Sequence, residues 1–211
     1  MTSTNQRFEN LDANPLPRFT PSPLRGHQLL DAVFAHISSL PEEGPDGGET
    51  WNQGTWLELD AAAVQRLFDK RSDALTPVDP ANVDSHLKLS PEVAITQCGT
   101  AACFAGHTGL MVGDSPLVRI DRWTEYAENG AATKRTAIRD DWGHLVDADG
   151  NVRGVRERAR DLLGLDYYQA ECLFNPSNTI HDLKTIIGLI KEGVAGVDIV
   201  ERYRREIGER L

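Results

Sequence analysis

Two cysteines and a histidine lie close together in the stretch TQCGTAACFAGHTGLMVGD, which covers residues 96–114. We predict a helix from Ala101 to about Val112 with Thr100 as its N-cap, because threonine caps helices well. Cys103 would then lie in the first turn, where the helix dipole and free N–H groups stabilise a thiolate. Residues of these types suit thiol catalysis, metal binding or close packing, and the rest of the chain must decide between them.

Thiol catalysis is one alternative, because a cysteine-dependent hydrolase or transferase needs a thiol, a histidine base and a group that orients the base. The nucleophile would be Cys98 or Cys103. The candidate bases are His144 and His181, and the candidate orienting groups are Asn175 and Asp182. The six histidines are scattered along the chain, so spacing alone does not select the base.

A small zinc-stabilised module is a further alternative, since zinc takes four tetrahedral nitrogen or sulfur ligands. Cys98, Cys103 and His107 are separated by four and by three residues, and Cys172 could complete a Cys3His set. The gap of four residues is at the upper end of the usual spacing for a cysteine pair. Cys172 also has the position of a core residue on its own amphipathic helix. We therefore expect no cofactor, with zinc as the alternative.

Small residues give the stretch its favoured interpretation, which is a helix packed at the centre of the core. Gly106 and Gly109 each cost a helix about 1 kcal/mol relative to alanine, so their presence indicates a packing or functional requirement. Together with Ala102 they form a face that a neighbouring backbone can approach closely. We predict that a neighbour crosses this helix closely, and that a large side chain at Gly106 destabilises the fold.

Apolar periodicity and capping signals predict most of the other elements. One apolar stripe at helical spacing consists of Leu29, Leu30, Val33, Phe34, Ile37 and Leu40, and this helix stops at Pro41. Further helices are predicted after Asp60 as N-cap, over residues 155–163 before Gly164, after an Asp166–Gln169 capping box, after Thr179, and in the last segment. A hairpin is predicted at residues 138–155. Two segments are ambiguous: residues 51–59 fit a short strand or a loop, and residues 115–130 fit a helix or a strand. A loop-rich segment is expected at residues 71–91.

The predicted fold class is therefore mainly α within the α+β class, with a helical core and one small β-hairpin. Residues 1–25 contain four prolines and are expected to form an extended arm. Residues 26–211 are expected to form a single mainly helical domain.

The composition narrows the classes of partner. The chain has 211 residues, a formal charge of −10 and a sequence pI near 5.0, which argues against broad electrostatic binding to nucleic acid. No apolar run approaches the ~20 residues of a membrane span, and the first residues lack a signal-peptide pattern. Three cysteines, an odd number, do not make a disulfide framework. We expect a cytoplasmic protein with reduced thiols and no membrane contact.

The segment CGTAACFAGH resembles the CGTxxCxAG[WH] motif of a family of bacterial and phage proteins for which no activity is established. GTWLEL and LLGLDYYQAECLF are similar to two other segments of that family, at residues 54–59 and 162–174. The resemblance implies no catalytic residues. It implies that one set of motif residues acts as a structural unit, namely Cys98, Gly99, Thr100, Cys103, Ala105 and Gly106.

The leading functional prediction is a non-enzymatic protein of bacterial or phage origin that binds another protein as an accessory or host-interaction factor. The strongest local signals are caps, an apolar stripe and a helix of small residues, all of which concern packing. The acidic surface and the proline-rich arm suit contacts with a protein partner.

Overall fold

The computed structural model describes residues 20–40, 49–70, 75–79, 86–97, 100–127 and 129–208. The helices are α2 (Gly26–Ile37), α3 (Ala61–Lys70), α4 (Pro91–Gln97), α5 (Phe104–Met111), α6 (Val155–Leu163), α7 (Tyr167–Leu173), α8 (Ile180–Lys191) and α9 (Gly196–Gly208). The strands are β1 (Thr50–Trp51), β2 (Leu57–Glu58), β3 (Leu75–Pro77), β4 (His86–Leu89), β5 (Ala101–Ala102), β6 (Ser115–Tyr126), β7 (Ala132–Val146) and β8 (Val152–Gly154).

The strands form two sheets, so the expected helical core with one small hairpin is wrong, and the fold is α+β with a substantial sheet. The larger sheet has five strands in the order β3-β4-β6-β7-β8, all antiparallel, and the smaller has the order β1-β5-β2. The predicted hairpin at residues 138–155 is present as β7 and β8, but β7 also pairs along its length with β6. The segment expected to be loop-rich contributes β3 and β4.

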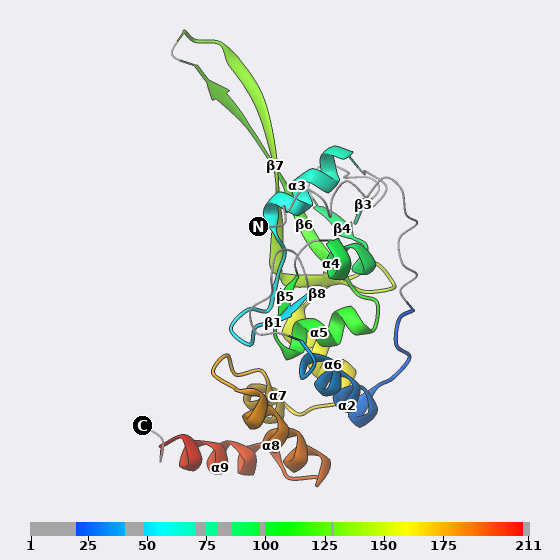
Figure 1. Ribbon diagram of the computed structural model, residues 1–211, viewed down its shortest axis with the longest axis vertical. Coiled ribbons are helices and arrows are strands. Elements are labelled where there is room, and N and C mark those ends of the chain that lie inside the picture. The colour runs from blue at the N-terminus through cyan, green and yellow to red at the C-terminus, as the bar shows by residue number, and fades with distance from the viewer. Residues whose placement is uncertain are drawn as a thin grey trace, which may run out of the picture.

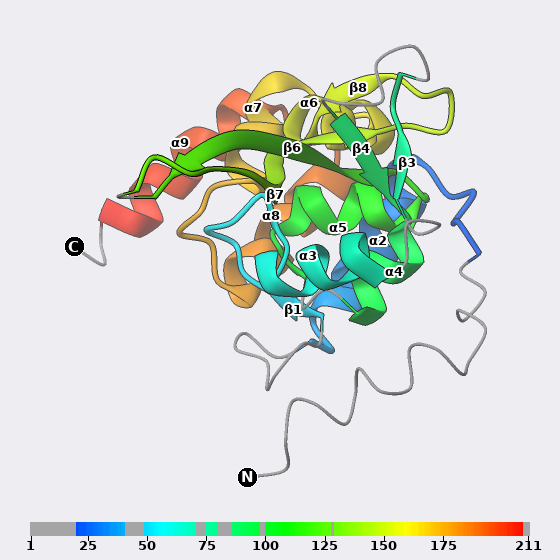
Figure 2. The same ribbon diagram turned by 90° about the horizontal axis from the view of Figure 1, so that it is seen from above.

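Two clusters of buried apolar residues hold the sheets and helices together. The first lies between the larger sheet and helices α3 and α4, where Val118, Ile120 and Ile138 pack with residues such as Leu67 and Val93. Figure 2 shows α3 and α4 on the same side of β4 and β6. The second cluster contains buried residues of α2 and α5 to α9, together with Trp51, Leu57 and Leu145. The fold therefore has two apolar cores, and α5 belongs to the second.

The local helix signals outside the cysteine motif are confirmed. In α2 the apolar stripe is buried at Leu29, Leu30, Val33 and Ile37. Asp60 accepts hydrogen bonds from the N–H groups of Ala62 and Ala63, as an N-cap should. Gly164 ends α6 with a φ of 66°, a left-handed conformation that suits glycine. The Asp166–Gln169 capping box is present, and Thr179 caps α8 in a second box with Asp182.

The helix of the motif begins later than predicted. Ala101 and Ala102 form β5, which pairs in parallel with β1 and antiparallel with β2, and α5 begins at Phe104 with Cys103 as its N-cap. The hydroxyl of Thr100 does not cap this helix, because it donates to the carbonyl oxygen of Ala94. The strand pairing is a long-range interaction that overrides the local capping signal.

Residues 1–19 of the predicted arm lie outside the described residues, and only its end can be placed. The N–H of Ser22 donates to the carbonyl oxygen of Met111 at 2.9 Å, so this segment lies against the C-terminus of α5. In the part of the chain that the structure describes, no helix combines the length and the apolar composition needed to cross a membrane.

Candidate functional site

Helix α5 is packed on all sides, and its glycines are required by that packing. All its residues from Phe104 to Leu110 are buried. A Cβ at Gly106 would overlap the carbonyl oxygen of Trp56 and lie 2.8 Å from the Cβ of Ala102, and a Cβ at Gly109 would overlap the side chain of Leu145. The predicted close approach is therefore present, and the neighbours are the backbone between β1 and β2 and a side chain of β7.

The cysteines have the environment of core residues. Cys103 and Cys172 are both buried, and neither forms a disulfide. The Cys103 thiol points at the carbonyl oxygen of Trp56 at 3.7 Å, and burial raises its pKa to about 11 despite opposing contacts from backbone groups of α5. A thiol of that pKa stays protonated near neutral pH, so Cys103 lacks the properties of a nucleophile. Cys98 and Gly99 lie outside the described residues.

Both candidate bases lie at the surface, whereas Cys103 is buried. His144 lies on β7, with Nδ1 2.8 Å from Oδ1 of Asp141, and it lines a surface pocket with residues that include His86 and Asp79. Among the described residues that line this pocket there is no cysteine. His181 is exposed on α8.

The two candidate orienting groups are used locally. The side chain of Asn175 accepts hydrogen bonds from the backbone and hydroxyl of Ser177. The carboxylate of Asp182 accepts from the N–H and hydroxyl of Thr179 in the capping box. The structure therefore gives no support to a triad built on Cys103.

His107 takes part in a different cluster from the one predicted. Each of the three side chains His36, Glu49 and His107 places one potential ligand atom within 4.8 Å of the others. Among the described residues, this is the one group of three or more potential metal ligands that lie close together. Neither Cys103 nor Cys172 belongs to it. We call these three side chains the His–Glu–His cluster. They come from the last turn of α2, the residue before β1 and the middle of α5.

One carboxylate oxygen is shared by two imidazole rings. Nε2 of His36 lies 3.1 Å from Oε1 of Glu49, and Nδ1 of His107 lies 3.2 Å from the same oxygen. The rings of His36 and His107 meet edge to face, with their centroids 5.4 Å apart. The cluster closes towards the core at His107, whose side chain is 1% exposed, and opens towards solvent at His36, whose side chain is 33% exposed.

The electrostatics of the cluster favour a negative Glu49. Burial alone would raise the pKa of Glu49, but the contacts with His107 and His36 outweigh burial and lower it to about 2. The hydrogen bond with Glu49 raises the pKa of His36, against the smaller opposing effect of burial. The carboxylate is therefore ionised across the physiological pH range and attracts positive charge to this position.

Sequence reasoning missed His36 and Glu49. The two residues are 13 positions apart, and His107 lies a further 58 positions along the chain, so no metal-ligand spacing links them. His36 and Glu49 are polar residues with apolar neighbours in the sequence, and this pattern is too common to indicate a site. The parallel pairing of β1 with β5 brings Glu49 next to α5.

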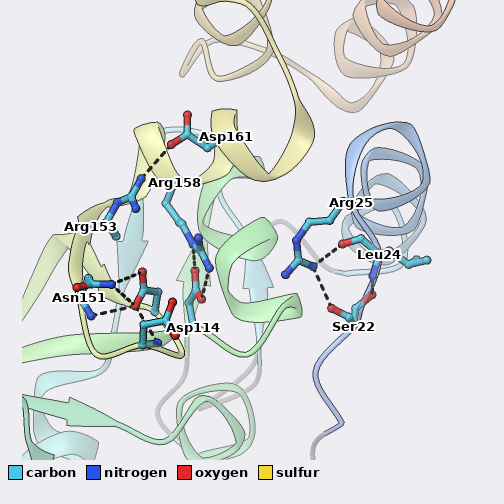
Figure 3. A network of polar contacts seen from close by, with 10 residues as sticks. Ser22, Leu24, Arg25, Asp114, Asn151, Arg153, Arg158 and Asp161 are labelled. Carbon is cyan, nitrogen blue, oxygen red and sulfur yellow. Dashed lines mark hydrogen bonds and ion pairs between the residues drawn. The ribbon is translucent and has the colours of Figure 1, made fainter.

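A buried ion pair also joins α6 to the end of α5. Arg158 donates from Nε and Nη2 to the two carboxylate oxygens of Asp114 at 2.7 and 3.0 Å (Figure 3). The Asp114 side chain is 2% exposed. A nearby pair, between Arg153 and Asp161, lies on the surface. We interpret the buried pair as structural, because the arginine satisfies both oxygens of the carboxylate.

The most prominent surface feature is the hairpin of β6 and β7, which extends far from the body of the protein (Figure 1). The two strands pair as far as Tyr126 and Ala132. Beyond the buried pair Ile120 and Ile138, the side chains are exposed or half-buried on both faces. We call residues 121–126 and 132–137 the hairpin arm.

The hairpin arm exposes two large aromatic side chains. Trp123 is 48% exposed and Tyr126 is 72% exposed. Their spacing of three residues places them on opposite faces of the ribbon, because successive strand side chains alternate. Trp123 pairs across the strands with Arg135.

Comparison with known proteins adds no functional information, since no protein-family model, curated protein or solved structure matches this chain. The resemblance of CGTAACFAGH to the bacterial and phage motif therefore stays a prediction. Function has to be inferred from the geometry of the chain itself.

Proposed function

We propose that the protein acts by binding another protein through the hairpin arm, as an accessory or host-interaction factor. The observation that carries this proposal is the exposure of Trp123 and Tyr126 on a ribbon that extends away from the body. Tryptophan, tyrosine and arginine are enriched among the residues that contribute most to protein interfaces. A two-stranded ribbon is only marginally stable in water by itself, so a surface that covers the arm would stabilise it.

Three arginines of the hairpin are paired with carboxylates, which favours a protein over a nucleic acid as the partner. The two carboxylate oxygens of Asp121 lie 2.9 Å from Nε of Arg119 and 3.0 Å from Nε of Arg139. Oε2 of Glu125 lies 2.7 Å from Nε of Arg135. Arginines that are paired with carboxylates are poorly placed to replace counterions on a phosphate backbone. The formal charge of −10 on the whole chain acts in the same direction.

The test compares the arm with an exposed aromatic residue elsewhere. The tagged protein is captured from cells that naturally express it, the partner is identified, and the affinity of the two purified proteins is measured. The double variant Trp123→Thr/Tyr126→Thr keeps residues that favour strands and removes both rings. The matched control is Tyr168→Thr on α7, where the tyrosine is 51% exposed.

We expect the double variant to bind the partner at least about tenfold more weakly, and the control to bind like the original protein. A second variant removes the part of the hairpin arm beyond Asp121 and Ala137, which face each other across the strands. An Asn-Gly turn joins these two residues instead. This variant should lose binding and still unfold cooperatively. Equal binding by the original protein and both arm variants would overturn the proposal, as would the recovery of no protein partner.

A further inference from the structure

Two hydrogen-bond acceptors face each other in the His–Glu–His cluster. Nε2 of His107 lies 3.1 Å from the carbonyl oxygen of Thr50. A carbonyl oxygen only accepts, so Nε2 must carry the proton of the neutral ring and Nδ1 must carry the lone pair. Nδ1 lies 3.2 Å from Oε1 of Glu49, a carboxylate oxygen that also carries lone pairs. A positive species is needed to make this contact favourable.

A proton on Nδ1 does not meet this need well. Although Nδ1 and Oε1 are 3.2 Å apart, Nδ1 is buried and forms no hydrogen bond. The ring is 1% exposed, so an imidazolium there would lose its hydration without gaining a well-directed hydrogen bond. A metal ion is not restricted to the line between the two atoms, because it binds the nitrogen lone pair and the oxygen from a third position.

We propose that His36, Glu49 and His107 bind a divalent transition-metal ion through Nε2, a carboxylate oxygen and Nδ1. Zinc ligands at ~2.0–2.2 Å in tetrahedral geometry are separated from one another by about 3.4 Å. The observed separations of 3.1 and 3.2 Å between the ring nitrogens and Oε1 are close to that value. Imidazole ligands select transition metals over Mg²⁺ and Ca²⁺, which prefer oxygen ligands.

The surroundings of His107 have the arrangement found around metal ligands. A metal-binding histidine usually donates its other ring N–H to a carbonyl or carboxylate group, which fixes the orientation of the ring. Here the carbonyl group of Thr50 receives that N–H. Thr50 is itself held in place, because its N–H donates to the carbonyl oxygen of Thr100 at 2.8 Å. The buried ligand is therefore positioned before the ion binds.

Three protein ligands leave a fourth position for water, on the side where His36 is partly exposed. The ion would join the end of α2 to β1 and α5, so binding should stabilise the fold. This inference is independent of the hairpin arm, and it differs from the Cys3His set considered from the sequence because it uses no sulfur ligand.

The experiment uses the full chain after removal of metals with a chelator. Zn²⁺ is titrated by calorimetry and the metal content is measured by elemental analysis. Co²⁺ is used as a spectroscopic probe, since thiolate ligands give an intense charge-transfer band and nitrogen and oxygen ligands do not. His36→Gln and Glu49→Gln remove one ligand each. His144→Gln is the matched control, because His144 forms a surface contact with Asp141 of similar length.

We expect about one Zn²⁺ per chain, a higher Tm with the metal, and a Co²⁺ spectrum without a thiolate band. His36→Gln and Glu49→Gln should each weaken binding on the order of 100-fold, and His144→Gln should not. His36 is partly exposed, so its variant should fold even if a variant of buried His107 does not. No binding of Zn²⁺ by the folded protein would overturn the proposal. Equal affinities for His36→Gln and His144→Gln would overturn it too, as would a thiolate band.

Discussion

The carbonyl oxygen of Trp56 occupies the space that a side chain at Gly106 would need. The same oxygen lies 3.7 Å from the Cys103 thiol, which donates to it from the start of α5. The backbone between β1 and β2 therefore rests directly on the helix, and this contact explains why a glycine occurs at a buried helical position. It also places Glu49 and Thr50, which precede that backbone, beside His107.

Replacement of Gly106 by alanine should destabilise the protein although alanine favours helices. The added methyl group overlaps the Trp56 carbonyl, and overpacking of this kind costs ~1–3 kcal/mol. We expect the Tm to fall by several degrees in calorimetry, since ~1 kcal/mol corresponds to ~2–4 °C for a protein of this size.

The control for this substitution is Gly188→Ala in α8. A Cβ at Gly188 meets nothing within 4 Å, so alanine there should raise stability by ~0.4–1 kcal/mol. If both variants changed the Tm by the same amount and in the same direction, the Trp56 contact would not be the cause.

Loss of Arg158 should be far more damaging than loss of Arg153. Arg158→Met leaves the Asp114 carboxylate buried without its cation, and breaking a buried pair in this way costs ~3 kcal/mol or more. Arg153→Met breaks a pair whose side chains are 37% and 45% exposed, which should change stability by ~1 kcal/mol or less. Urea unfolding of both variants measures the difference, and equal losses would contradict the structural interpretation of the buried pair.

Cys103 should react slowly with iodoacetamide at neutral pH in the folded protein. Its pKa lies near 11 because the thiol is buried, so very little of it is the reactive thiolate at neutral pH. The measurement is mass spectrometry of labelled protein in a Cys98→Ser background, with a sample in denaturant as the control. Rapid labelling of Cys103 before unfolding would restore the thiol-catalysis alternative.

Asp147 should make a contribution to stability that depends on pH. Burial opposes ionisation of its carboxyl group, but hydrogen bonds from Asn151 and the N–H of Asp149 outweigh burial and lower its pKa below the ordinary value of 3.8. A lowered pKa stabilises the fold fully above that ordinary value and progressively less as the pH falls below it.

Asp147→Asn should therefore cost about 1 kcal/mol at pH 7 and less at pH 3, as measured by urea unfolding. Asp149→Asn, an exposed change in the same turn, is the control and should have little effect at either pH. A loss for Asp147→Asn that is as large at pH 3 as at pH 7 would show that its charge is not involved.

The sequence by itself determined the local features of the helices. The apolar stripe of α2, the caps at Asp60 and Thr179, the Gly164 terminus and the Asp166–Gln169 capping box depend on residues within about four positions of one another. The glycines of α5 correctly indicated a close approach because glycine in a helix carries a cost that needs a reason. Local interactions of this kind can be evaluated without knowledge of the rest of the fold.

Only the tertiary structure decided which segments became strands and where chemistry could occur. A short strand such as β5 exists because its backbone pairs with β1 and β2, which are far away in sequence. The start of α5 is fixed in the same way, since the side chain of Gln53 accepts from the N–H of Phe104 across 51 positions. The His–Glu–His cluster unites three distant segments. Sequence spacing carries no signal for such contacts, because the folded backbone alone sets the distances between them.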